Sequence, residues 1–289
     1  MNRFLTLLII SCSSLWAQAK PCSWVYLQSA KAIKLKSGSR IFKLENGDFY
    51  KEESPRNSPF ELAFNDDRAS VLASQFLNAF GVGKYIAKTE HLENGMDLIV
   101  EGKKIQTKRG ILQEGRQDIE TPLEGHKAIY GVPPTYSHQV NSVLSQGDWP
   151  RHYANWKIIW VLLRQIDLNI ENLGVSKGNV FIFDLGDTFN KNATRCQFGV
   201  CNELQNFDFI FPNSPSDRTQ HVPDLRKADN EIKAFVKSLA NSSVEDLKKM
   251  VGPAFDHHLR APRGNTEEVL SSIRDSAKQL MPLLDRPPF

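Results

Sequence analysis

Three polar side chains with metal-binding oxygens lie within a short stretch of the C-terminal half. Asn172 follows Asp167 by five residues, and Asp184 follows Asn172 by twelve. The apolar run Val180–Phe183 directly precedes Asp184, which is typical of a short buried strand that ends at a carboxylate. Carboxylate and amide oxygens are the hard ligands that Mg²⁺ takes in proteins, commonly together with substrate phosphates. The pattern therefore predicts that the strand directs a carboxylate toward a metal ion.

Phosphoryl transfer from a nucleotide needs this combination of groups. Metal ions and a lysine neutralise the charge that develops on the transferred group, and a carboxylate orients the attacking hydroxyl. An Asp-x4-Asn spacing alone is common, but an Asp-x-Gly that follows it at this distance and after a strand is much rarer. The competing interpretation is that these residues are ordinary turn residues at the end of a strand.

The stretch resembles the catalytic and metal-binding loops of the protein-kinase-like superfamily. The segments "QIDLNIENLGV" and "VFIFDLGDTF" carry the resemblance, which is closest to the atypical branch of HipA-like, phosphoinositide and secretory-pathway kinases. The resemblance implies that Asp167 is the catalytic aspartate and that Asn172 and Asp184 are the metal ligands. The implied cofactors are ATP and Mg²⁺ or Mn²⁺.

The resemblance also implies a lysine that binds the ATP phosphates in the N-terminal half. The segment "RIFKLENGDFYKEES" is similar to the strands that deliver this lysine, which assigns the role to Lys51, with Lys43 as the alternative. Gly38 and Ser39, in "KSGSR", are the candidates for covering the phosphates.

The helix expected after Lys51 departs from the family pattern. In "RASVLASQFLNAFGV", Ser70 stands where the acidic partner of the lysine is expected. Asp67 lies one turn earlier on the same face and is the substitute, unless it only interacts with the helix dipole. Asn169 replaces the lysine or histidine that relatives often carry two residues after the catalytic aspartate. Both departures keep a nucleotide-binding but inactive pseudokinase open as an alternative.

Sequence periodicity predicts strands with one helix first, and then mostly helices. The expected strands are Ile33–Leu35, Ile41–Leu44, Phe49–Lys51, Met96–Val100, Gly110–Gln113 and Val180–Phe183, and the expected helices are Asp67–Phe80, Trp156–Ile166, Ala228–Ala240 and Thr266–Leu284. The passage 121–139 is expected to be rich in loops. This order predicts an α+β chain of two lobes, with a β-rich N-lobe over 20–120 and a mostly helical C-lobe over 121–289. The resemblance implies that these lobes form a protein-kinase-like fold.

The N-terminus predicts export. The segment "MNRFLTLLIISCSSLWAQAK" has one basic residue, an apolar stretch and an Ala-x-Ala ending, which is the pattern of a secretory signal peptide over residues 1–19. A lipoprotein signal with Cys12 as the lipidated residue is the alternative. The expected location is the periplasm or outside the cell, with no transmembrane segment in the mature chain. The sequence leaves open whether Cys196 and Cys201 form a disulfide there.

Composition narrows the classes of function. The chain has 289 residues, 40% of them hydrophobic, and a formal charge of +3, so it can bury a large core and gives no case for a nucleic-acid partner.

The predicted function is an exported kinase-like transferase that moves a phosphoryl group from a nucleotide to a hydroxyl of an unknown protein, lipid or sugar. The alternatives are the pseudokinase scaffold, a kinase-fold AMP transferase and an unrelated secreted binding protein.

Overall fold

A computed structural model describes most of the elements that the sequence predicts. It covers residues 28–34, 40–52, 66–132, 140–164, 170–183, 185–186, 188–189, 223–252, 255 and 265–285, with the backbone alone for 28–34, 66–68 and 171. Several predictions fall outside these residues: the signal peptide, Cys12, Gly38, Ser39, Asp167, Asp184 and the Cys196–Cys201 pair.

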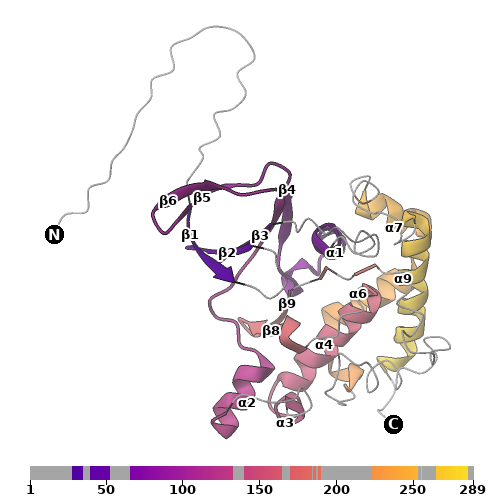
Figure 1. The fold of residues 1–289 in the computed structure, drawn as a ribbon. Helices are drawn as coiled ribbons and strands as arrows, with labels where there is room; N and C mark the ends of the chain where they lie inside the picture. The colour runs from indigo at the N-terminus through magenta and orange to yellow at the C-terminus, as the bar shows by residue number, and fades with distance from the viewer. Residues whose placement is uncertain are drawn as a thin grey trace, which may run out of the picture.

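Strands and one long helix make up the first part of the chain, and helices dominate the second (Figure 1). The strands are β1 (Gln28–Lys34), β2 (Arg40–Leu44), β3 (Phe49–Glu52), β4 (Thr89–Leu92), β5 (Asp97–Val100), β6 (Lys103–Gln106), β7 (Gly110–Gln113), β8 (Leu173–Ser176) and β9 (Asn179–Ile182). The helices are α1 (Asp66–Ala79), α2 (Pro122–Tyr130), α3 (Asn141–Leu144), α4 (Trp149–Leu162), α6 (Asn230–Asn241), α7 (Val244–Val251) and α9 (Thr266–Leu280). Short 3-10 turns are η2 (Gly83–Tyr85), η4 (Ile170–Asn172), η6 (Leu225–Lys227) and η7 (Met281–Leu283). The predicted α+β class is confirmed.

Seven strands form one sheet in the order β4-β7-β3-β2-β1-β5-β6, and only the β1–β5 pair is parallel. The predicted Asn46-Gly47 turn connects β2 to β3, and Gly47 has φ 96°, which favours glycine. At Gly110, β7 passes so close to β3 that an added Cβ would lie 2.2 Å from the carbonyl oxygen of Lys51. Glycine at this position therefore lets the sheet form beside the candidate lysine.

The two faces of this sheet are covered by different elements. A small core of Phe42, Leu44, Tyr50 and Leu98 lies on one face, together with apolar residues of the β5–β6 hairpin and its flanks. No α1 residue belongs to that core, and α1 contacts β4 and β7. We conclude that α1 packs on the opposite face of the sheet.

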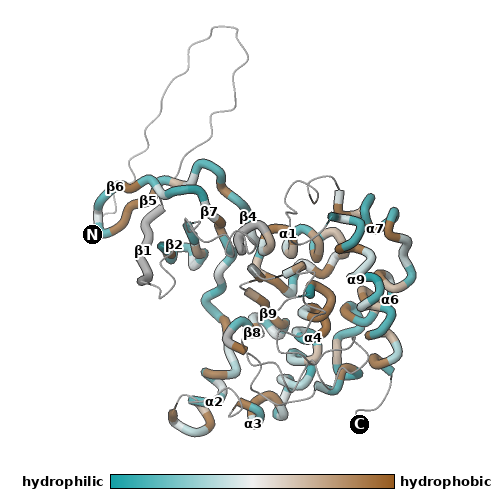
Figure 2. Tube along the Cα trace, turned by 45° about the vertical axis from the view of Figure 1, so that its right-hand side comes forward, coloured by the Kyte–Doolittle hydropathy of each residue, from teal (hydrophilic) through white to brown (hydrophobic). Residues whose placement is uncertain are grey.

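The main hydrophobic core surrounds α4. Every α4 residue from His152 to Leu162 is buried, as expected for a helix that is covered on all sides. Phe76 of α1 and Val180 of β9 belong to the same core, so α1 and the β8–β9 hairpin are both attached to the helical part. Hydrophobic and hydrophilic residues alternate along α6 and α9, which is typical of helices with one buried face (Figure 2).

Two sequence predictions of local structure were wrong. Residues 122–130 form α2 rather than loop, although Thr121 and Glu124 form a capping box and Pro122 begins the helix, which together are a recognisable start signal. The central helix spans Trp149–Leu162 rather than Trp156–Ile166. Its first turns contain polar residues that are buried by tertiary contacts, so hydrophobicity alone placed its start too late. None of the helices within the described ranges combines the length and hydropathy needed to span a membrane.

Candidate functional site

The β8–β9 hairpin brings Asn172 next to the residue that precedes Asp184. Leu173 pairs with Ile182, and the carbonyl oxygen of Asn172 accepts a hydrogen bond from the backbone amide of Phe183 at 3.3 Å. Asp184 is the next residue in the chain. The register of the hairpin therefore brings Asn172 next to Phe183, the residue that directly precedes the second predicted metal ligand.

The side chain of Asn172 is buried, and one of its polar atoms has no hydrogen-bond partner among the described residues. It is 9% exposed, and among the described residues its Nδ2 atom has no hydrogen-bond partner. Leaving a buried polar group unpaired costs about 1–3 kcal/mol, so native proteins seldom do it without a functional reason. Because the two ends of a side-chain amide are assigned from their hydrogen bonds, a flipped amide would place the Oδ1 atom at the unpaired position. Asn172 thus fits a place among the ligands of a hard cation.

The outer edge of β9 is attached to the segment that follows α1. Ile86 forms a parallel bridge with Ile182, and the amide of Ala87 donates to the carbonyl oxygen of Ile182 at 2.9 Å. This contact lies two residues before Asp184. The connection between α1 and β4 therefore fixes the strand that leads to the predicted metal ligand.

Lys51 and Lys43 lie on the same face of the sheet. Directly paired residues of antiparallel strands share a face, and so do Phe49 and Lys51, which are two residues apart on β3. Lys51 pairs with Ile111, and Lys43 pairs with Phe49. This face is opposite to that of Tyr50 and is the one we assign to α1. Lys51 is half-buried, whereas Lys43 is exposed and its Nζ lies 5.7 Å from the ring of Phe49.

The first turns of α1 hold the two positions at which an acidic partner for the lysine was sought. The backbone of Asp67 lies in the first turn of the helix, as the sequence predicted. Ser70, which occupies the expected acidic position, is 3% exposed. The glutamate that follows Lys51 has a different role: Glu52 lies on the opposite face and accepts two hydrogen bonds from Arg40, at 2.5 and 2.6 Å.

The segment between β7 and α2 packs along the β8–β9 hairpin. Glu120 and Val175 exchange two backbone hydrogen bonds of 2.9 and 2.8 Å, so this connection extends the hairpin by one bridge. The guanidinium carbon of Arg116 lies 4.0 Å from the centroid of the buried Phe181 ring. Cation–π contacts of this kind are stronger when the cation is partly desolvated, so Arg116 helps to hold the connection on the hairpin.

Asp229, at the start of α6, is a residue that sequence reasoning missed. Its carboxylate accepts hydrogen bonds from Tyr85 at 3.0 Å, Arg151 at 2.9 Å and Asn155 at 2.7 Å. Partial burial alone would raise the pKa of Asp229, but these hydrogen bonds outweigh it and hold the pKa below its usual value. The cluster joins the segment after α1 to α4 and α6. A lone aspartate before a helix gives no sequence signal for such a role.

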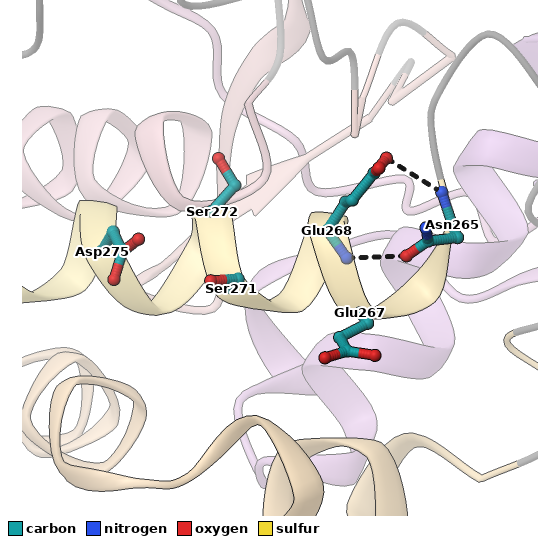
Figure 3. A pocket seen from close by; sticks show the side chains of 6 residues that line it. All are labelled: Asn265, Glu267, Glu268, Ser271, Ser272 and Asp275. Atoms are coloured by element: carbon teal, nitrogen blue, oxygen red, sulfur yellow. Dashed lines mark hydrogen bonds between the residues drawn. The ribbon is translucent and has the colours of Figure 1, made fainter.

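A pocket with a polar lining lies along the first turns of α9 (Figure 3). It is lined by Asn265, Glu267, Glu268, Ser271, Ser272 and Asp275. The dashed lines in Figure 3 show that Asn265 and Glu268 form the capping box of the helix. These acidic residues are thus accounted for by helix capping and solvent exposure. No group of three or more His, Cys, Asp or Glu able to hold a metal occurs within the described ranges, which exclude Asp167 and Asp184.

Comparison with known proteins finds relatives only at the level of structure. No family model and no curated protein matches the chain. The Golgi casein kinase aligns with 89% of this chain and 71% of its own, at 10% identity and a TM-score of 0.43. The hydra Fam20 structure with sugar aligns with 91% of this chain and 86% of its own, at 10% identity and a TM-score of 0.43. The *Helicobacter pylori* proinflammatory kinase CtkA aligns with 86% of this chain and 94% of its own, at 12% identity and a TM-score of 0.39.

The chain is similar to these kinase structures over most of its length, but only at TM-scores of 0.39 to 0.43. The order of its elements, a strand-rich part with one main helix followed by a mostly helical part, is the order that the sequence predicted. At these identities and TM-scores the likeness supports no conclusion about the site. The chemistry of the site is therefore inferred only from the residues of this chain.

Proposed function

We propose that this protein is an exported phosphotransferase that moves a phosphoryl group from a nucleotide to a hydroxyl acceptor with the help of a divalent metal. The observation that carries the proposal is the buried, unpaired side-chain amide of Asn172, held by the hairpin beside the residue that precedes Asp184. Most buried polar groups in native proteins are hydrogen-bonded, so the unpaired Nδ2 atom of Asn172 supports a ligand-binding role at this place.

Each predicted residue has a distinct role in this proposal. Asn172 and Asp184 would hold Mg²⁺ or Mn²⁺, which supplies positive charge to the nucleotide phosphates when bound. Lys51 would pair with the same phosphates, and Asp167 would orient the acceptor hydroxyl and accept its proton. Lys51 is preferred over Lys43 because it is half-buried in β3 beside β7, which α1 contacts, whereas Lys43 is exposed and lies near Phe49.

Phosphate transfer from labelled ATP tests the proposal. The mature chain from Lys20 would be incubated with ATP labelled on the γ-phosphate and with Mn²⁺ or Mg²⁺, alone and with protein, lipid and sugar acceptors. We expect label on the chain or an acceptor, and loss of that label in Asp184→Ala and in Asp167→Asn. Transfer that survives in both variants would overturn the assignment of these residues.

A pseudokinase is the second candidate, because the buried Ser70 stands where an acidic partner of Lys51 is expected. Binding of ATP and metal without transfer of any phosphate would favour it. Label that appears on the acceptor only from α-labelled ATP would favour the AMP transferase instead. If nucleotide does not bind at all, the protein is an unrelated binding protein on a similar fold.

Export is a separate part of the proposal and is supported by residues 1–19 alone. We expect the secreted or periplasmic protein to begin at Lys20, as determined by mass spectrometry of its N-terminal peptide. A lipid on Cys12 would instead support the lipoprotein alternative.

A further inference from the structure

A fully buried threonine lies just after the predicted metal ligand. Thr188 is 0% exposed, and its hydroxyl lies 2.9 Å from the carbonyl oxygen of Leu185 and 3.2 Å from that of Ala69. Its backbone amide also donates to the carbonyl oxygen of Leu185, at 3.3 Å. One side chain thus closes the turn that begins directly after Asp184 and also contacts the first turns of α1.

The contact with α1 falls where this chain departs from the kinase pattern. Ala69 directly precedes Ser70, the residue found in place of the expected acidic partner of Lys51. An ion pair at that position would align α1 with the site through charge. Here the hydroxyl of Thr188 lies within hydrogen-bond distance of two uncharged carbonyl oxygens, one from α1 and one from the turn after Asp184.

The next residue strengthens the same connection. The amide of Phe189 donates to the carbonyl oxygen of Leu163 at 2.7 Å, and its ring packs edge-on against Phe76 of α1 with centroids 6.1 Å apart. Leu163 lies at the end of α4, four residues before Asp167. Thr188 and Phe189 together attach one turn to α1 and to the helix that leads to the predicted catalytic residue.

We infer that Thr188 is a positioning residue, whose hydroxyl holds α1 and the turn after Asp184 in a fixed relation. The inference rests on the proposed function, since it assigns the residue that keeps the metal-binding carboxylate in place. A neutral, buried hydrogen bond is neither titrated near neutral pH nor screened by salt, whereas an ion pair at the surface is screened. This hydrogen bond would align α1 whether or not Lys51 has an acidic partner.

Two substitutions separate the hydroxyl from the shape of the side chain. Thr188→Val keeps the shape and removes the hydroxyl, and Thr188→Ser keeps the hydroxyl and removes a methyl group. We expect Thr188→Val to lower kcat by roughly tenfold or more and to raise the Mn²⁺ concentration needed for half-maximal rate, because small displacements of a reacting group are costly. We expect Thr188→Ser to stay within about threefold of the wild type, and the KM for nucleotide to change less than kcat in both variants.

The outcomes distinguish this inference from the proposed function. If the wild type neither binds nucleotide nor transfers phosphate, the proposed function fails. If the wild type is active and Thr188→Val matches it in kcat and Mn²⁺ requirement, the positioning role is wrong. If Thr188→Val does not fold, as judged by circular dichroism, Thr188→Ser decides alone: a loss of activity there shows that the methyl group matters and contradicts the role of the hydroxyl.

Discussion

At the scale of single residues, Asn172 offers the test that separates the proposed functional site from an ordinary turn. Most buried polar atoms in proteins are paired, and the Nδ2 atom of Asn172 has no partner among the described residues. Removing an unpaired buried group is nearly neutral or stabilising, whereas removing a metal ligand lowers activity. Stability and activity should therefore change independently at this position.

We predict that Asn172→Ala leaves the unfolding midpoint unchanged or raises it, and lowers phosphate transfer by about 10-fold to 100-fold, as expected for the loss of one group that orients a metal. Thermal unfolding and initial rates measured on the same samples would check this. Asn172→Asp is the matched control, because it keeps an oxygen ligand and should retain more activity. A variant that loses stability and keeps its activity would show that Asn172 is structural.

The two candidate lysines provide a second test at this scale. Lys51→Met should abolish transfer and weaken nucleotide binding, because it removes the amine that would face the phosphates. Lys43→Met should leave the rate close to that of the wild type, since Lys43 is exposed. Initial rates and nucleotide titrations of the two variants would be compared directly. The reverse pattern would transfer the role to Lys43.

At the scale of elements, α4 carries a histidine that responds to pH. Burial lowers the pKa of His152 to about 4, with a smaller effect of the positive charge of Arg151, and the buried Nδ1 atom has no hydrogen-bond partner among the described residues. An unfolded histidine has a pKa near 6.5, so between about pH 6.5 and pH 4 the unfolded chain binds a proton that the folded chain does not. The contribution of neutral His152 to the free energy of unfolding is thus fully present above about pH 6.5 and is lost as the pH falls.

We predict that the unfolding free energy falls by up to about 3 kcal/mol across this interval because of His152, and that His152→Gln removes this part of the slope. Urea unfolding at a series of pH values would measure it. The folded pKa of Asp229 lies below its usual value, so the contribution of Asp229 itself is lost only at lower pH than that of His152. An unchanged slope in His152→Gln would contradict the assignment.

Elements with a clear period were predictable from the sequence, and elements defined by long-range contacts were not. The strand Gly110–Gln113 was predicted with its observed bounds, and α1 was predicted to within one residue at each end. Strand β6 was missed because Lys103 and Lys104 give an edge strand no apolar alternation. The start of α4 was missed because Asn155 is a polar residue that is buried only through its contacts with other elements, which a local pattern does not reveal.

At the scale of the whole molecule, the sequence predicted which residues are candidates for the site but not how they are held. The spacing of Asn172 and Asp184 is explained by the register of the β8–β9 hairpin, in which Asn172 bonds to Phe183. The contacts of Asp229 with Tyr85 and Arg151, and of Thr188 with Ala69, join segments that lie far apart in the sequence. No local signal predicts such pairs, since each is set by how the strand-rich and helical parts pack.

Co-operative binding of nucleotide and metal by the mature chain tests the central claim most directly. We expect ATP and Mn²⁺ added together to raise the unfolding midpoint well beyond either alone, since a ligand at about 100 times its dissociation constant stabilises the native state by about 2.7 kcal/mol. The double variant Asn172→Ala, Asp184→Ala should show no such joint increase. An equal increase in that variant, or none in the wild type, would contradict a metal–nucleotide site at the end of the β8–β9 hairpin.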